Sequence, residues 1–273
     1  MMLLDLICYD CIMEQVGKGI PNTTPGEPIM TPFELVNNTG IYEVNCNKGH
    51  SSLTVINNID FEILFEYGLN AIVDGYYREA VSSLTAALER YYEFFIKTAL
   101  NATNIDFSTI DKVWKSVSNQ SERQIGAYIF LYFQMFGIEP SLPNTNKEVP
   151  FRNSVIHKGY IPNQQESIDY GNKILELIES SLIDLKEKYP VSVIETFENY
   201  GYRKVATEKF EKIKKDTGKE QDFACVNIMT TIDVINGREI NSGDGRQGNV
   251  ELRIESILKE RAPRKLTLIK KKE

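Results

Sequence analysis

The chain is poor in the residues that most often carry metal and acid–base chemistry. Its 273 residues include only two histidines, His50 and His157, and four cysteines. Four cysteines do not predict a disulfide framework, because we expect this chain in the reducing cytoplasm. Metal binding and simple burial remain open for the thiols. Cys225 stands alone in the apolar segment FACVNI, which favours burial as a small hydrophobic side chain.

Long apolar runs are also absent. The longest aromatic and aliphatic run, AYIFLYFQMFGI at residues 127–138, contains Gln134 and is shorter than the about 20 residues that cross a bilayer as a helix. We therefore predict that it is buried core. The first residues, MMLLDLICYDC, offer neither a basic region nor a small-residue cleavage site, so they do not resemble a signal peptide. We expect a cytoplasmic protein without a membrane partner.

An excess of basic residues is missing as well, since the net charge is −7. This excludes a protein that wraps nucleic acid over its whole surface, but it leaves a local basic patch open. Apolar residues make up 42% of the chain and charged residues 25%, which is typical of a globular protein. The chain has no internal repeat and no low-complexity tract, and its length suggests about two domains.

Local patterns nevertheless divide the chain into three parts. Residues 1–57 contain turn signals and the alternating segment SSLTVI, which predict a small β-rich module. Residues 58–190 carry apolar residues at helical spacing and predict a helical bundle. Residues 191–273 predict a small α+β domain. The expected fold class is therefore mainly α, with two small β-containing additions.

Two features refine the bundle. A break near Asp74 and Gly75 divides its first helical segment into two long amphipathic helices. Farther along, Asn163 and Glu166 have the spacing of a capping box, so we expect a helix to begin there.

The C-terminal part mixes both kinds of signal. We predict a helix from Ser192 to about Lys215, followed by the strand-like segment FACVNIMTTIDVI. Asn236 and Gly237 form a typical hairpin-turn dipeptide, and the segments VELRI and KLTLI both alternate. These signals predict further strands.

Three of the four cysteines and one histidine are concentrated near the N-terminus. Cys8 and Cys11 form a C-x2-C pair, and Cys46 and His50 form a C-x3-H pair at the tip of a predicted hairpin. Two such pairs facing each other supply the four tetrahedral ligands that zinc prefers. We predict a structural zinc ion in a zinc-ribbon-like module, since a full set of four ligands leaves no open position. The alternative is a pair of buried thiols beside a surface histidine.

The segment FRNSVIHKGYIP, residues 151–162, is the second candidate site. It places Arg152 and His157 five residues apart, with Asn153 directly after the arginine and Gly159 shortly after the histidine. Five residues correspond to about 140° around a helix, so the two side chains do not share a narrow face. We expect Gly159 to end the helix, which leaves His157 in its last turn. The alternative is an ordinary helix end, where cationic side chains interact with the helix dipole.

This segment resembles the signature helix of the HEPN superfamily, whose mark is an arginine followed four to six residues later by a histidine. A polar residue, often asparagine, directly follows the arginine in that family, as Asn153 does here. The segment AALERYYEFFIKTAL also resembles an earlier long helix of the family's bundle, and the resemblance covers about residues 60–190. It implies a homodimer in which both motifs line one cleft.

The resemblance implies a metal-independent endoribonuclease that leaves 2′,3′-cyclic phosphate ends. Imidazole titrates near physiological pH, so His157 would be the general acid or base. The guanidinium of Arg152 would stabilise phosphate charge, and Asn153 would orient its neighbours. Glu89 or Glu93 would add a carboxylate to the cleft.

Related families imply a toxin-like or antiviral-defence RNase that acts on RNA and is restrained by a regulatory or antitoxin partner. A tyrosine that some relatives carry two residues after the histidine is a glycine here, Gly159. We therefore do not expect modification at that position. The alternatives are a non-catalytic dimeric HEPN bundle that acts as a binding scaffold, with the zinc module as its recognition element, and a nucleotide-binding or antitoxin-paired protein.

Overall fold

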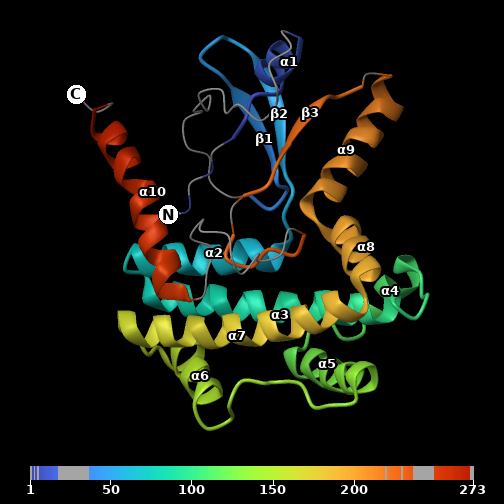
Figure 1. Ribbon diagram of the computed structural model, residues 1–273, viewed down its shortest axis with the longest axis vertical. Coiled ribbons are helices and arrows are strands. Elements are labelled where there is room, and N and C mark those ends of the chain that lie inside the picture. The colour runs from blue at the N-terminus through green and yellow to red at the C-terminus, as the bar shows by residue number, and fades with distance from the viewer. Residues whose placement is uncertain are drawn as a thin grey trace. The chain divides into compact units, whose positions relative to one another are not determined.

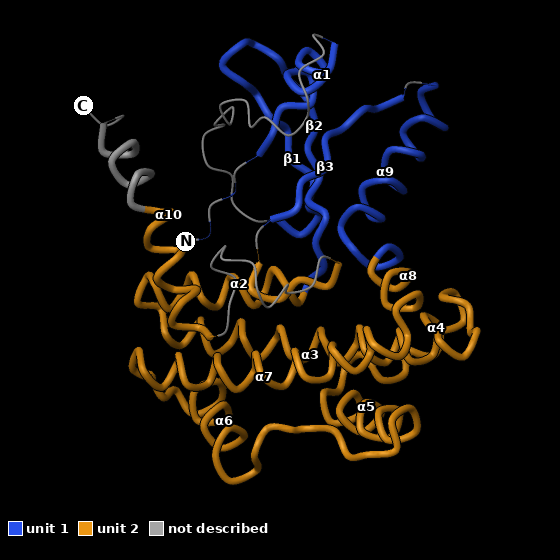
Figure 2. The backbone as a smooth tube through the Cα atoms, viewed as in Figure 1, with its two compact units in different colours: residues 1–60, 198–229 blue, residues 61–197, 230–273 orange. Residues whose placement is uncertain are grey.

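The computed structural model of the chain describes residues 2, 4, 6–17, 37–218, 220–228, 230–235 and 249–270. It is mainly helical with one small sheet, as predicted. The chain forms two compact units, coloured separately in Figure 2. Unit 1 comprises residues 1–60 and 198–229, and unit 2 comprises residues 61–197 and 230–273.

The elements of unit 1 are a three-stranded sheet and the helices on its two faces (Figure 1). They are α1 (Tyr9–Gly17), β1 (Ile41–Asn45), β2 (Ser51–Ile56), α9 (Tyr202–Thr217) and β3 (Phe223–Val226). Strands β1 and β2 form the predicted antiparallel hairpin, and β3 lies parallel to β2 on its other side.

Alternation along β2 gives the sheet its two packed faces. Val55 packs against Ala206 and Phe210 of α9. On the opposite face, Thr54 donates a hydrogen bond to the backbone carbonyl of Ile7, just before α1. The turn before β1 needs glycine, because Gly40 has a φ of 62° and a Cβ there would lie 2.7 Å from the Tyr202 side chain.

Unit 2 is a helical bundle. Its helices are α2 (Asp60–Val73), α3 (Tyr77–Asn101), α4 (Phe107–Trp114), α5 (Ser121–Phe136), α6 (Glu148–Lys158), α7 (Gln164–Lys188) and α10 (Val250–Lys270), and α8 (Pro190–Tyr200) joins it to unit 1. The long helices α3 and α7 lie side by side (Figure 1). The predicted break between α2 and α3 is confirmed at Gly75, whose φ is 79°.

Aromatic side chains form much of the bundle core. The Phe95 ring lies 4.8 Å from Tyr128 and 5.6 Å from Tyr132, measured between ring centroids. Phe61 and Tyr91 meet edge to face at 5.4 Å, a geometry that adds to the stabilisation from burial alone. The core therefore joins helices that are distant in the sequence.

The C-terminal part differs from the prediction in several ways. Residues 191–273 do not form a compact unit of their own, since β3 joins the sheet of unit 1 whereas α10 belongs to unit 2. The helix predicted from Ser192 is broken at Gly201 into α8 and α9. Of the strand-like segment after α9, only Phe223–Val226 is a strand. The predicted turn at Asn236 and Gly237 lies outside the described residues.

The segments VELRI and KLTLI are helical, not strands, because both lie in α10. Alternation over five residues is compatible with either structure, and for VELRI the burial of Val250, Ile254 and Ile257 at helical spacing decides it. Ion pairs also link α10 to α2 and to the residue that follows α2: Arg253 contacts the buried Glu66 at 3.1 Å, and Arg261 contacts Asp74 at 2.6 Å. These charged partners lie nearly two hundred residues apart in the chain.

Two predictions of burial are wrong. In the run at residues 127–138, Tyr128 and Tyr132 are buried, but Phe130 is 76% exposed and Phe133 is 54% exposed. Only one face of α5 packs against α3, so apolar side chains on the other face remain on the surface of the bundle. Cys225 is also exposed, and it lies on β3, which pairs with β2 on one side only among the described residues. No helix among the described residues has the length and hydropathy needed to cross a membrane.

Candidate functional site

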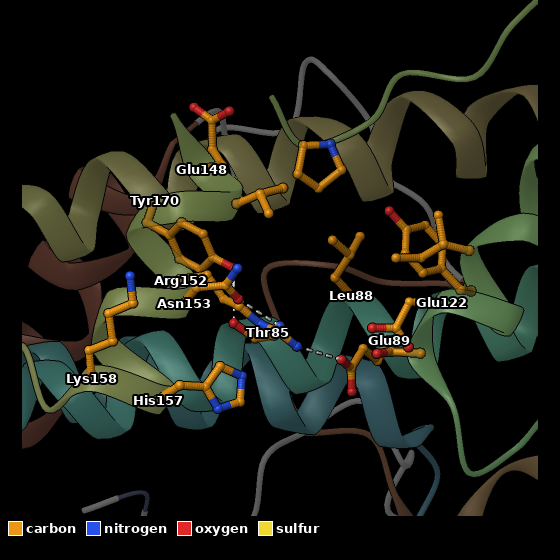
Figure 3. Close-up of a pocket in the computed structure, with 15 residues that line it drawn as sticks. Thr85, Leu88, Glu89, Glu122, Glu148, Arg152, Asn153, His157, Lys158 and Tyr170 are labelled. Atoms are coloured by element: carbon orange, nitrogen blue, oxygen red, sulfur yellow. Dashed lines mark hydrogen bonds and ion pairs between the residues drawn. The ribbon is translucent and has the colours of Figure 1, made fainter. Parts of the chain in front are cut away.

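The three polar residues of the Arg152 motif line one cavity in unit 2 (Figure 3). Its volume is about 560 Å³, within the range of small-ligand sites. Helices α3, α5, α6 and α7 contribute to its wall. The cavity is lined by Thr85, Leu88, Glu89, Tyr92, Ser121, Glu122, Ile125, Pro143, Glu148, Val149, Arg152, Asn153, His157, Lys158 and Tyr170.

Arg152 is held from two sides. Its Nη1 donates to Asn153 Oδ1 at 3.1 Å, and its Nη2 donates to Glu89 Oε1 of α3, also at 3.1 Å. Figure 3 shows the side chain extending toward Glu89. A guanidinium has five N–H donors, and the other three form no hydrogen bond to the residues that the structure describes. The carboxylate expected in the cleft is therefore Glu89. Glu93 instead pairs with Arg90 and Lys97.

His157 lies in the last turn of α6, as predicted. The helix ends at Gly159, whose φ of 74° is the left-handed conformation that glycine adopts readily. Asn153 and His157 are four residues apart, so both project from the same side of the helix toward the cavity (Figure 3). The ring of His157 is exposed and forms no hydrogen bond with the residues that the structure describes. It is free to contact a ligand.

Sequence reasoning missed the other walls of the cavity. Tyr170 of α7 shares a hydrogen bond of 2.9 Å with Thr85 of α3, and burial raises the pKa of its phenol to about 12. Beside the polar end, Leu88, Tyr92 and Ile125 contribute apolar surface. The α3 residues recur at helical spacing, but this pattern alone does not distinguish a cavity wall from core.

The predicted metal-binding residues of unit 1 also lie together. The ligand atoms of Cys8, Cys11, Cys46 and His50 are all within 4.8 Å of one another, and this set can hold a metal ion. The Sγ atoms of Cys11 and Cys46 are 3.7 Å apart. His50 Nδ1 lies 3.3 Å from the Sγ of Cys11 and 3.9 Å from that of Cys8. All three cysteines are buried.

Local structure brings the two pairs together. Cys8 directly precedes α1 and Cys11 lies in its first turn, so the first pair lies at a helix start. Cys46 and His50 close the turn between β1 and β2, where the Cys46 N–H donates to the His50 carbonyl at 3.0 Å. Gly49 has a φ of 85°, which this turn requires.

The thiols differ in their surroundings. Burial and the neighbouring thiols raise the pKa of Cys11 to about 12. Burial opposes ionisation of Cys46 too, but backbone N–H groups of His50 and Lys48 outweigh it and lower the pKa of this thiol to about 7. The Lys48 N–H lies 3.4 Å from Cys46 Sγ. The hairpin tip therefore presents a thiol that readily becomes a thiolate, the form that binds metals.

Comparisons of this chain with known proteins found no match. No protein-family model matches the sequence, no curated protein matches it, and no solved structure matches the fold.

Proposed function

We propose that the protein is a metal-independent endoribonuclease of the HEPN type, with its active site in the cavity of unit 2. The observation that carries the proposal is the gathering of Arg152, Asn153 and His157 around one cavity, with Glu89 holding the arginine. The type of reaction is inferred from the resemblance of the sequence to the HEPN superfamily. The side chains in the cavity are suited to that reaction.

The reaction requires proton transfer and charge stabilisation. The RNA 2′-hydroxyl attacks the adjacent phosphate, the 5′-oxygen of the next nucleotide leaves, and a 2′,3′-cyclic phosphate remains. His157, unpaired and exposed, exchanges a proton with the attacking or the leaving oxygen. Arg152 directs its remaining donors to the phosphate oxygens, and Glu89 and Asn153 fix its orientation. Lys158 adds positive charge at the same end of the cavity.

The apolar wall fits an unstacked base. Leu88, Tyr92 and Ile125 face the cavity beyond Arg152, and a base next to the cleaved phosphate would pack against them. Bases reach such a cavity only from single strands, loops or bulges. We accordingly propose single-stranded RNA as the substrate class.

A homodimer is part of the proposal. Phe130 and Phe133 lie three residues apart on the exposed face of α5, a helix whose first turns line the cavity. A second copy of the chain would remove these rings from water. Sedimentation of the wild type beside the Phe130→Ser/Phe133→Ser variant tests this. The variant should form a weaker dimer, which dissociates into monomers at a higher protein concentration than the wild-type dimer does. Identical sedimentation of both proteins contradicts this interface.

The first experiment measures cleavage of end-labelled single-stranded RNA without added divalent metal. We expect the wild type to cleave and His157→Ala to lose about 10²–10⁴-fold in rate, the usual contribution of a general acid or base. Lys158→Ala is the matched control, because it removes a neighbouring charge from the same cavity wall and leaves the acid–base group in place. It should weaken RNA binding with little change in the rate at saturation.

Arg152→Lys separates charge from geometry. It keeps the positive charge but loses the planar fork, so cleavage should fall although the variant folds. If none of these proteins cleaves RNA although all of them fold normally, the result favours the alternative of a scaffold. In that case the bundle binds partners without catalysis. The toxin-like or antiviral setting and the restraining partner stay predictions from the resemblance.

We also propose that the four-residue cluster of unit 1 binds zinc as a structural ion. Tetrahedral coordination with Zn–S bonds of about 2.3 Å places two sulfurs about 3.8 Å apart, and a sulfur and a nitrogen about 3.6 Å apart. The Cys11–Cys46 separation of 3.7 Å and the His50 separations of 3.3 and 3.9 Å are close to these values. Four protein ligands leave no position for a substrate, which favours a structural role.

A further inference from the structure

Glu14, which belongs to neither predicted pair, contacts the presumed metal ligand His50. It lies one turn after Cys11 on α1. Its Oε1 is 3.3 Å from His50 Nε2, and its Oε2 is 3.1 Å from Nζ of Lys48. The other ring nitrogen of His50, Nδ1, faces the thiols of Cys11 and Cys8. The two nitrogens of this imidazole thus have opposite surroundings.

Those surroundings select one tautomer. A nitrogen that binds a metal must present its lone pair, so the other nitrogen of a neutral imidazole carries the proton. A carboxylate accepts a hydrogen bond and cannot donate one when ionised, which places the proton on Nε2 beside Glu14. The remaining lone pair is then on Nδ1, the nitrogen that lies 3.3 Å from the sulfur of Cys11 and 3.9 Å from that of Cys8.

We propose that Glu14 is a positioning residue of the metal centre, which accepts the Nε2 proton of His50 and thereby fixes Nδ1 as the metal-binding atom. The inference rests on the proposed zinc site. Lys48 holds the second oxygen of Glu14 and belongs to the same turn as His50, so the carboxylate links α1 to the hairpin tip. These contacts would orient the imidazole of His50 before a metal ion binds.

The other ligands have comparable support. Ser52 Oγ donates to Cys8 Sγ at 3.3 Å, and the Lys48 N–H donates to Cys46 Sγ at 3.4 Å. Such outer contacts stabilise thiolate and imidazole ligands in the geometry that the metal requires, and losing one typically reduces metal affinity about 10–100-fold. Glu14 is the outer partner of the one nitrogen ligand.

The test is zinc affinity of the full-length chain, measured by competition with a chromophoric chelator. Glu14→Ala should weaken zinc binding about 10–100-fold, whereas Glu14→Gln, which still accepts through its amide oxygen, should lose less. Asp10→Asn is the matched control, because it removes one negative charge from the same helix, and Asp10 has no hydrogen bond or ion pair among the described residues. Its affinity should stay within about twofold of the wild type.

A second readout reports the tautomer directly. Nitrogen NMR of the imidazoles resolves His50 from the only other histidine, His157. We expect metal at Nδ1 and a proton at Nε2 in the zinc-bound wild type. Zinc at Nε2, or equal affinities for Glu14→Ala and Asp10→Asn, overturns the role of Glu14 while the metal site stands. Absence of zinc binding by the wild type overturns the metal site, and the role of Glu14 falls with it.

Discussion

The two units organise their chemistry in opposite ways. In unit 2, long helices bury an aromatic core around Phe95 and Tyr128, and the candidate catalytic residues line a cavity at its surface. In unit 1, the candidate ligands Cys8, Cys11 and Cys46 are themselves buried, and the sheet has strands from both ends of the chain. Unit 2 thus has an aromatic core that is separate from its candidate catalytic site. In unit 1, the candidate metal ligands are themselves part of the buried interior.

This contrast has a physical basis. A long helix of 25 residues, such as α3 or α7, forms its backbone hydrogen bonds internally and buries a continuous stripe. A five-residue strand such as β1 needs partners, and small segments often obtain the missing stability from a metal. We therefore expect unit 1 to depend on its metal and unit 2 to be indifferent to it.

The largest expected effect is that of metal removal. A structural zinc contributes on the order of 10 kcal/mol to folding of small zinc domains, so a strong chelator should unfold unit 1. Hydrogen exchange of the whole chain would then show lost protection in β1 and β2 and unchanged protection in α3 and α7. Cys11→Ser should mimic the chelator, whereas Cys225→Ser, an exposed cysteine of the same unit, should not. Retained protection of β1 and β2 after chelation contradicts the comparison.

A core substitution should have the reverse pattern. Phe95 is fully buried, and Phe95→Ala should destabilise unit 2 by about 3–5 kcal/mol through lost packing and a cavity. Phe130→Ala, on the exposed face of the bundle, should change stability by less than about 0.5 kcal/mol in the monomer. Denaturant unfolding followed by helical circular dichroism measures both. The metal affinity should be unaltered in each variant, and a shared loss would show that the units are not independent.

The smallest effect concerns a single helix start. Asn163 accepts from the Glu166 N–H at 2.9 Å, and Glu166 accepts from the Asn163 N–H at 2.8 Å. Asn163→Ala should cost about 1 kcal/mol in unit 2, since it leaves a helix donor without its partner. Gln164→Ala, at the next and equally exposed position, is the control and should be nearly neutral. Equal unfolding midpoints for the two variants would show that the cap is dispensable.

Several features of the molecule followed from residues close together in the chain. The capping box at Asn163 and the end of α6 at Gly159 both appear as the local pattern predicted. The hairpin of β1 and β2 likewise follows from its alternation and its turn. These interactions span three to six residues or one tight turn, so the sequence determines them before any tertiary contact forms.

Distant contacts decided the remainder. Alternation in VELRI fits a strand as well as a helix, and only burial against the bundle distinguishes them. The sequence of an apolar run does not show which face of the helix packs against other helices. The exposure of Phe130 therefore could not be predicted from it. The partners of the candidate sites are equally non-local: Glu89 reaches Arg152 from 63 positions away, and Glu14 reaches His50 across 36 residues.

The sequence by itself thus determined the break between α2 and α3, the end of α6, the start of α7, the hairpin, and the residue types from which the two candidate sites are built. Tertiary structure decided which side chains complete those sites, which face of α5 stays exposed, and how the C-terminal residues are shared between the units. The reason is that backbone hydrogen bonds and turns are local, whereas burial and side-chain pairing depend on segments that folding alone brings together.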